Sequence, residues 1–120
     1  MSTKSFLIIN RRPPYASNLA REALDSALTV AVFEQPVAIL FLSDAVYQLL
    51  PDQQPAAIGQ KSLAANLQVL PMYDIEQLYV SARALAERGL STDQLAVPVT
   101  ELDDDAVQTL IKQHDVVLNF

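Results

Sequence analysis

The order of hydrophobic and polar positions along the chain predicts strands that alternate with helices. Residues 6–9 and 37–42 are continuous apolar runs, which are typical of strands that are covered on both faces. Residues 78–80 are leucine, tyrosine and valine, which favour a short buried strand. The strands predicted in this way span residues 5–10, 37–42, 78–80, 95–100 and 115–120.

Helices are predicted in the first half of the chain between these strands. Apolar residues recur at helical spacing from Leu19 to Val32, and Ser17 or Asn18 can cap this helix. A short helix over residues 45–50 follows the second strand, with Ser43 or Asp44 as its cap and Pro51 at its end. A further amphipathic segment covers residues 58–70 and ends at Pro71.

Two more helices are predicted in the second half. One begins near Ala82, directly after the third strand, and Gly89 ends it at the C′ position. The other begins at Asp103, Asp104 and Asp105, because carboxylates suit the N-cap and the positive end of the helix dipole. The three carboxylates could also suggest a divalent cation, but no further ligands follow at calcium-loop spacing.

The alternation of elements predicts a single domain over residues 1–120. Strands followed by helices indicate a three-layer α/β/α architecture with a five-stranded, mainly parallel sheet. Pro98 lacks an N–H group, so the fourth strand is expected at an edge of this sheet.

Composition adds an expectation about assembly. The chain is 51% hydrophobic and 18% charged, with a mean hydropathy of +0.19. This is more apolar material than the core of a small domain needs, since small domains keep a large surface. The surplus predicts a subunit interface.

Charge and cysteine content exclude several classes of function. The net charge of −6 and a pI near 4.5 argue against direct binding to nucleic acid. No apolar run approaches the roughly 20 residues of a membrane span, and the amino terminus does not resemble a signal peptide. Without cysteine there is no disulfide, thiolate metal site or thiol nucleophile, which fits a cytoplasmic location.

Glycine content limits the cofactors. The chain has two glycines, Gly59 and Gly89, so neither a dinucleotide-binding turn nor a P-loop can form. We therefore expect no cofactor. We also expect no metal, because the chain has no cysteine and no further ligands follow the three aspartates at 103–105 at calcium-loop spacing.

The candidate chemical groups lie where strands end. Ser81 stands at the junction of a strand and a helix, where α/β proteins often place their chemistry. A hydrolase that uses Ser81 lacks a base, because the single histidine, His114, precedes the last strand and so lies at the other end of the sheet. Arg11 and Arg12 follow the first strand and could bind an anion, or they could belong to a solvated loop.

Two motifs carry a resemblance to a known family. Residues 37–55, Val-Ala-Ile-Leu-Phe-Leu-Ser-Asp-Ala-Val-Tyr-Gln-Leu-Leu-Pro-Asp-Gln-Gln-Pro, resemble the strand, turn and proline loop of the TusC/DsrF proteins. Residues 73–77 with 88–90 are similar to the second signature of that family, and residues 115–120 to its closing strand. The resemblance covers the whole chain and departs at Ala45, where the family usually has glycine.

The resemblance implies a DsrE-like fold, of the flavodoxin/Rossmann-like topology class, and a role in sulfur relay. It implies a heterohexamer with TusB-like and TusD-like subunits that passes sulfur from TusA through TusD to TusE and on to the tRNA wobble uridine. An ungapped count from Gly89 aligns the sulfur-carrier cysteine of TusD/DsrE with Ser81. Serine has no accessible persulfide chemistry, so a non-catalytic subunit, not an enzyme, is expected.

Two alternatives and a set of interface candidates complete these expectations. The chain could be a DsrF-type subunit of a DsrEFH complex in dissimilatory sulfur oxidation, or a homo-oligomeric protein that binds an anion or small molecule. Tyrosine is enriched at interfaces, and the motif positions whose residue types go beyond core packing are the interface candidates: Asp44, Tyr47, Tyr73 and Asp74.

Overall fold

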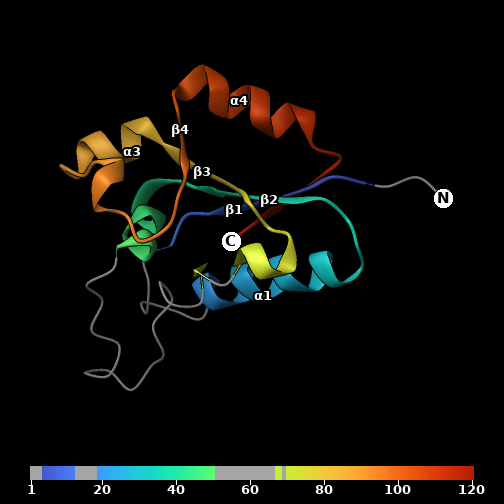
Figure 1. The fold of residues 1–120 in the computed structure, drawn as a ribbon. Helices are drawn as coiled ribbons and strands as arrows, with labels where there is room; N and C mark the ends of the chain where they lie inside the picture. The colour runs from blue at the N-terminus through green and yellow to red at the C-terminus, as the bar shows by residue number, and fades with distance from the viewer. Residues whose placement is uncertain (1–3, 13–18, 51–66, 69) are drawn as a thin grey trace.

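The computed structural model describes residues 4–12, 19–50, 67, 68 and 70–120. These residues form a five-stranded sheet in the order β4-β3-β2-β1-β5, and each neighbouring pair is parallel (Figure 1). The sheet confirms the predicted α/β class with a parallel sheet. Its strands are β1 (Phe6–Asn10), β2 (Val37–Phe41), β3 (Gln77–Ser81), β4 (Thr100–Leu102) and β5 (Val116–Asn119).

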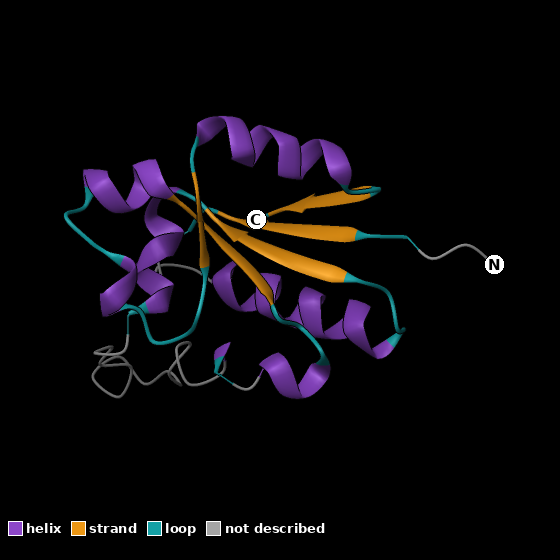
Figure 2. Ribbon diagram, turned by 45° about the horizontal axis from the view of Figure 1, so that its top comes forward, coloured by secondary structure: helices purple, strands orange, loops and turns teal. Residues whose placement is uncertain are grey.

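Helices cover both faces of the sheet. Helix α1 (Leu19–Val32) lies on one face, and α4 (Asp104–Gln113) lies on the other (Figure 2). Helix α3 (Ala82–Glu87) packs against the 3₁₀ helix η1 (Ser43–Leu49) beyond the carboxyl ends of the strands. Two further 3₁₀ helices are η3 (Leu70–Tyr73), which lies beside α1, and η4 (Thr92–Gln94).

The described apolar side chains pack in two clusters, one on each face of the sheet. The cluster beneath α1 is large, because η1, η3 and α3 also contribute to it. The cluster beneath α4 is smaller, and Leu110 is the buried residue that α4 contributes. The buried residues of this smaller cluster are Leu7, Ile9, Ala38, Leu40 and Leu110.

Helix α3 ends as its sequence predicts. Gly89 has a φ of 66°, in the left-handed region that favours glycine. Its N–H donates to the carbonyl of Ala86, and the N–H of Leu90 donates to the carbonyl of Leu85. These two bonds form a Schellman motif, which satisfies carbonyls at the end of the helix.

The residue range predicted for the fourth strand is wrong, but the prediction that this strand lies at an edge of the sheet is confirmed. The expected range was 95–100, whereas β4 spans Thr100–Leu102. Val97 is buried in the larger cluster, so the chain before β4 packs against the core and does not run along β3. Pro98 therefore precedes the strand, and β4 still forms one edge of the sheet.

The segment after β2 also differs from its prediction. It is a 3₁₀ helix that begins at Ser43, and Leu42 is its N-cap residue without a side-chain cap, so the predicted cap at Ser43 or Asp44 is wrong. The carboxylate of Asp44 instead binds Arg88. Ala45 is buried within this helix, and the residue with a positive φ, 52°, is Ser43. The alanine is therefore tolerated at Ala45 without backbone strain.

The remaining boundaries can be compared in part. Asp103 caps α4 as predicted, since its carboxylate accepts a hydrogen bond of 2.8 Å from the N–H of Ala106. Pro71 lies inside η3, so the prediction that it ends a helix is wrong. The predicted caps Ser17 and Asn18, the end at Pro51 and most of the segment 58–70 lie outside the described residues.

Candidate functional site at the carboxyl edge of the sheet

Because the strands are parallel, their carboxyl ends lie along one side of the sheet, which we call its carboxyl edge. Along the chain, successive strands from β1 to β4 are added in one direction, and β5 is then added on the other side of β1. Ligands of open α/β sheets bind beyond the strand ends at such a reversal. A ligand or a reactive side chain is therefore expected in the loops after β1, β2, β3 and β5.

Ser81 is the last residue of β3 and the N-cap of α3. Its Oγ accepts a hydrogen bond of 3.1 Å from the N–H of Ala84, and the residue is 7% exposed. A serine in this position satisfies one of the free N–H groups at the start of a helix. The hydroxyl at this strand–helix junction thus has a structural role in the fold.

His114 lies at the opposite edge, as its place in the sequence predicts. It is the C-cap residue of α4, two residues before β5 begins, and its Nδ1 lies 2.8 Å from the carbonyl oxygen of Leu110. Ser81 ends a strand, whereas His114 precedes one. The length of a parallel strand therefore separates the two side chains, and His114 cannot act as a base for Ser81.

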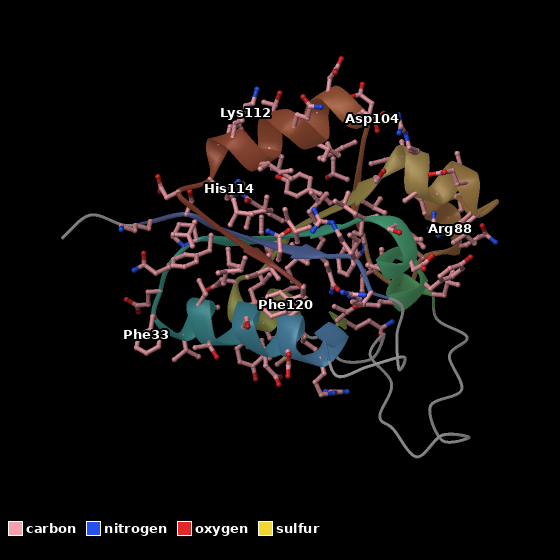
Figure 3. All side chains as sticks on the ribbon, turned by 180° about the vertical axis from the view of Figure 1, so that it is seen from behind. Phe33, Arg88, Asp104, Lys112, His114 and Phe120 are labelled. Atoms are coloured by element: carbon pink, nitrogen blue, oxygen red, sulfur yellow. The ribbon has the colours of Figure 1, made fainter. Side chains whose placement is uncertain are left out.

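Arg88 joins α3 to η1. Its Nη2 and Nε donate to Oδ1 of Asp44 at 2.8 and 3.1 Å, and its Nη1 donates to the carbonyl of Ala84 at 3.1 Å. The guanidinium carbon lies 5.9 Å from the ring centre of Tyr47, within the range of a cation–π contact. The Arg88 side chain is 18% exposed, and it points toward η1 from α3 in Figure 3.

These contacts give the interface candidates Asp44 and Tyr47 an additional role inside the subunit. Arg88 belongs to the family signature at residues 88–90, but the sequence does not indicate that it contacts Asp44 and Tyr47. An arginine just before the C′ glycine of a short helix is in a position to reach a neighbouring element.

A buried pair of amides lies under the loop after β1. The Asn10 Nδ2 donates to the Gln48 Oε1 at 3.1 Å, and the Gln48 Nε2 donates to the Asn10 Oδ1 at 2.9 Å. The Gln48 Nε2 also donates to the carbonyl of Arg12 at 2.7 Å. This pair fixes β1 and the loop after it against η1. In the sequence, a glutamine between the apolar residues Val46 and Leu49 could have indicated a buried polar contact.

Arg11 and Arg12 line a hollow of about 490 Å³ at the reversal between β1 and β5. Ser43, Asp44, Asn119 and Phe120 complete the lining described for it. The Nη1 of Arg11 donates to the Oδ1 of Asn119 at 2.7 Å, so this guanidinium is held against β5. Arg12 is exposed and is available to an anion that enters the hollow.

Tyr73 and Asp74 lie at the other end of the sheet from this hollow. Tyr73 ends η3, and Asp74 follows it in the short connection to β3 with a φ of 63°. The structure therefore separates the four interface candidates into two pairs, one at each edge of the sheet.

The composition of the described ranges, 4–12, 19–50, 67, 68 and 70–120, limits the class of site. Within those ranges there is no group of three or more His, Asp or Glu side chains placed to hold a metal ion. None of the helices in the described part of the chain is long and apolar enough to cross a membrane.

Comparison with known proteins identifies the family. The model of the DsrE/DsrF-like family matches residues 4–120. A protein named TusC homolog from Pseudomonas aeruginosa is 50% identical over 116 residues, which are 97% of this chain and 98% of that protein. The TusC protein of Escherichia coli O157:H7 is 37% identical over 108 residues, which are 89% and 91% of the two chains.

A solved structure supports the same fold. The crystal structure of the ychN protein from E. coli covers 99% of this chain and 100% of its own, with a TM-score of 0.83 and 22% sequence identity. This likeness concerns the fold alone. Because the family model matches almost the whole chain, the protein belongs to the DsrE/DsrF-like family.

Proposed function

We propose that the protein is a subunit of a TusBCD-type sulfur-relay complex and does not itself carry sulfur. The observation that carries this proposal is Ser81, which caps α3 at the position that aligns with the sulfur-carrier cysteine of TusD/DsrE. The sequence contains no cysteine at any position. The likeness to proteins named TusC over nearly the whole chain supports membership of the complex.

The chemistry of the hydroxyl supports a role without sulfur transfer. A persulfide carrier needs a thiolate, and the pKa of a serine hydroxyl is far above that of a thiol. The Oγ of Ser81 is also engaged with the backbone of α3 and largely buried. The proposed role is to hold TusB-like and TusD-like subunits in a cytoplasmic heterohexamer that supports 2-thiolation of the tRNA wobble uridine.

Co-expression with the TusB-like and TusD-like subunits of the same organism tests the assembly. The expected result is one species whose native mass corresponds to two copies of each subunit. The chain expressed alone is expected to self-associate or aggregate, because surplus apolar surface is then uncovered. A well-behaved monomer that ignores both partners would overturn the proposal.

Complementation tests the role of Ser81. In cells that lack the endogenous subunit, Ser81→Ala is expected to restore thiolation of tRNA as well as the unchanged chain does. Loss of thiolation by Ser81→Ala, while co-purification still recovers the whole complex, would assign Ser81 a chemical role and contradict the proposal.

A second candidate function rests on the hollow beside Arg12. The guanidinium of Arg12 is exposed there, at the reversal of the strand order where α/β sheets bind ligands. A homo-oligomeric protein that binds a sulfur oxyanion would show a higher melting temperature with sulfite or sulfate than with chloride at equal ionic strength. The Arg12→Gln variant would lose this difference. The names of the relatives favour the tRNA branch over a DsrF-type role.

A further inference from the structure

Four large apolar side chains are exposed near the amino ends of β2 and β3. Val32 ends α1 and Phe33 directly follows it, whereas Met72 and Tyr73 end η3. Their exposed fractions are 69%, 71%, 82% and 49%. They are the large hydrophobic side chains that the described part of the chain leaves exposed, and we call them the amino-edge patch.

The two halves of the amino-edge patch belong to neighbouring elements. Helix η3 lies beside the second half of α1 in Figures 1 and 2, and the two elements are in contact. Residues from both elements line one hollow of about 400 Å³ between the end of α1 and Tyr73. Phe33 stands at the end of α1 and points away from the sheet in Figure 3.

The backbone holds both halves of the patch in the same way. After α1, the N–H groups of Glu34 and Gln35 donate to the carbonyls of Ala31 and Val30. After η3, the N–H groups of Asp74 and Ile75 donate to the carbonyls of Pro71 and Leu70. Both ends repeat the Schellman pattern that Gly89 makes after α3.

The residue at the left-handed position differs between these three ends. Gly89 occupies it after α3, whereas Glu34 and Asp74 occupy it beside the amino-edge patch, with φ of 60° and 63°. A glycine there would avoid the steric cost of a side chain in the left-handed region. Glu34 and Asp74 thus keep a carboxylate at positions that glycine occupies with less steric cost.

Both carboxylates border the hollow beside the patch. Glu34 and Asp74 are exposed, and the other described residues that line this hollow, Ala31, Gln35, Pro36, Val37 and Tyr73, carry no positive charge. The surface therefore combines exposed apolar side chains with two carboxylates that have room for a cationic group.

We infer that the amino-edge patch binds a different subunit of the complex, through apolar side chains and a lysine or arginine that enters between Glu34 and Asp74. A second copy of this chain would bring the same carboxylates and a net charge of −6, so like charges disfavour a defined dimer through this face, whereas its apolar side chains can still aggregate without a fixed geometry. The inference rests on the proposed function, since the partner is a subunit of the proposed complex.

Glycine substitution separates binding from folding. In the variant Glu34→Gly with Asp74→Gly, the left-handed positions lose their strain, so the isolated chain should melt at the same temperature or a higher one. The same variant loses the carboxylates, so the concentration of TusB-like and TusD-like subunits needed for half-maximal assembly should rise about tenfold. A higher melting temperature with weaker assembly cannot result from misfolding.

Charge reversal and a matched control complete the experiment. Glu34→Lys with Asp74→Lys should abolish assembly, whereas Glu87→Lys with Glu101→Lys changes charge equally at exposed sites away from the patch and should leave assembly unchanged. If the unchanged chain assembles and both patch variants assemble equally well, the inference is wrong and the proposed function stands. If the unchanged chain binds neither subunit, the proposed function fails. A homodimer that the patch variants abolish would make a second copy the occupant and overturn the inference.

Discussion

The hydroxyl of Ser81 bonds to the backbone of α3, and this bond determines what its replacement does. Ser81→Ala removes the cap from the N–H of Ala84, and loss of a serine N-cap costs about 1 kcal/mol of the free energy of unfolding. Ser81→Thr keeps an oxygen in the same place and should cost less. Urea denaturation of the two variants checks this expectation, and an equal loss in both would mean that the cap is not the source.

The carboxyl of Asp115 stabilises the fold more at a pH above its ordinary pKa than at a pH below it. The Ser5 backbone N–H and the Ser5 hydroxyl both donate to Oδ2 of Asp115, and these bonds lower the pKa of the carboxyl below its ordinary value of 3.8. A group whose pKa is lower in the folded state stabilises the fold above the unfolded pKa. This contribution is lost as the pH falls through the folded pKa.

The Asp115→Asn variant should therefore be less stable than the unchanged protein at pH 7, and the difference should shrink as the pH falls below 3.8. Denaturation midpoints in urea at several pH values between 7 and 2.5 measure this difference. Asp25→Asn serves as a control that removes one carboxylate from the exposed side of α1. A pH-independent difference for Asp115→Asn would contradict the assignment.

At the scale of elements, the ion pair of Arg88 joins α3 to η1, whereas that of Arg83 with Asp104 lies on the surface. Arg88→Met keeps an apolar stem but removes the bonds to Asp44 and to the carbonyl of Ala84. We expect it to lower the free energy of unfolding by about 1.5–3 kcal/mol, the range for hydrogen bonds to charged groups.

Arg83→Met is the matched control for this variant. Both partners of its ion pair are exposed, and such pairs contribute about 0–1 kcal/mol. Chemical denaturation of both variants gives the comparison, and equal losses would show that Arg88 does not connect the two elements more tightly than a surface pair does.

The Asn10–Gln48 pair links β1 to η1 and should behave as a unit. Asn10→Leu or Gln48→Met alone removes both bonds of the pair and leaves the remaining buried amide with fewer hydrogen bonds, which costs about 1–3 kcal/mol. The double variant should cost less than the sum of the two single variants, by a coupling energy of about 0.5–3 kcal/mol. A double-mutant cycle in urea measures this coupling, and strict additivity would contradict it.

The sequence predicts elements best where one local pattern decides the structure. The predicted ranges of β1, β2 and β5 match the observed strands within one residue at either end. The position of β4 was wrong because Val97 is apolar enough to fit a strand but packs into the core instead. Local pattern does not distinguish these two uses of a buried valine.

The candidate site was predictable to a similar degree. The junction at Ser81 follows from a strand that runs directly into a helix. The pairs Asp44–Arg88 and Asn10–Gln48 join residues that are 44 and 38 positions apart, and no periodic pattern encodes such partners. They depend on which elements the sheet topology brings together.

At the scale of the whole molecule, the two faces of the sheet are covered unequally. Helix α1 buries Ala23, Leu24 and Ala27, whereas α4 buries Leu110 and keeps its other apolar side chains partly exposed. A helix with few buried contacts opens at a lower free energy than the strands beneath it. The α4 layer should therefore be the less stable cover.

Native-state hydrogen exchange tests this difference. The amides of α4 should open with a smaller free energy than those of β1 and β2, and α1 should lie closer to the strands. Exchange measured at increasing low concentrations of denaturant separates such openings. If α4 exchanges with the same free energy as β2, the two faces open together and the expectation is wrong.

The strand β1 has β2 on one side and β5 on the other, and its contacts with β5 join residues 110 positions apart. During synthesis, β1 leaves the ribosome before the other strands and can pair with β2, but its second edge stays open until β5, 110 positions later, has been made. An open edge is a template for pairing with another nascent chain. The second edge of β1 can therefore pair with another chain until β5 is available. Slow translation of the second half of the message would lengthen this period and increase aggregation.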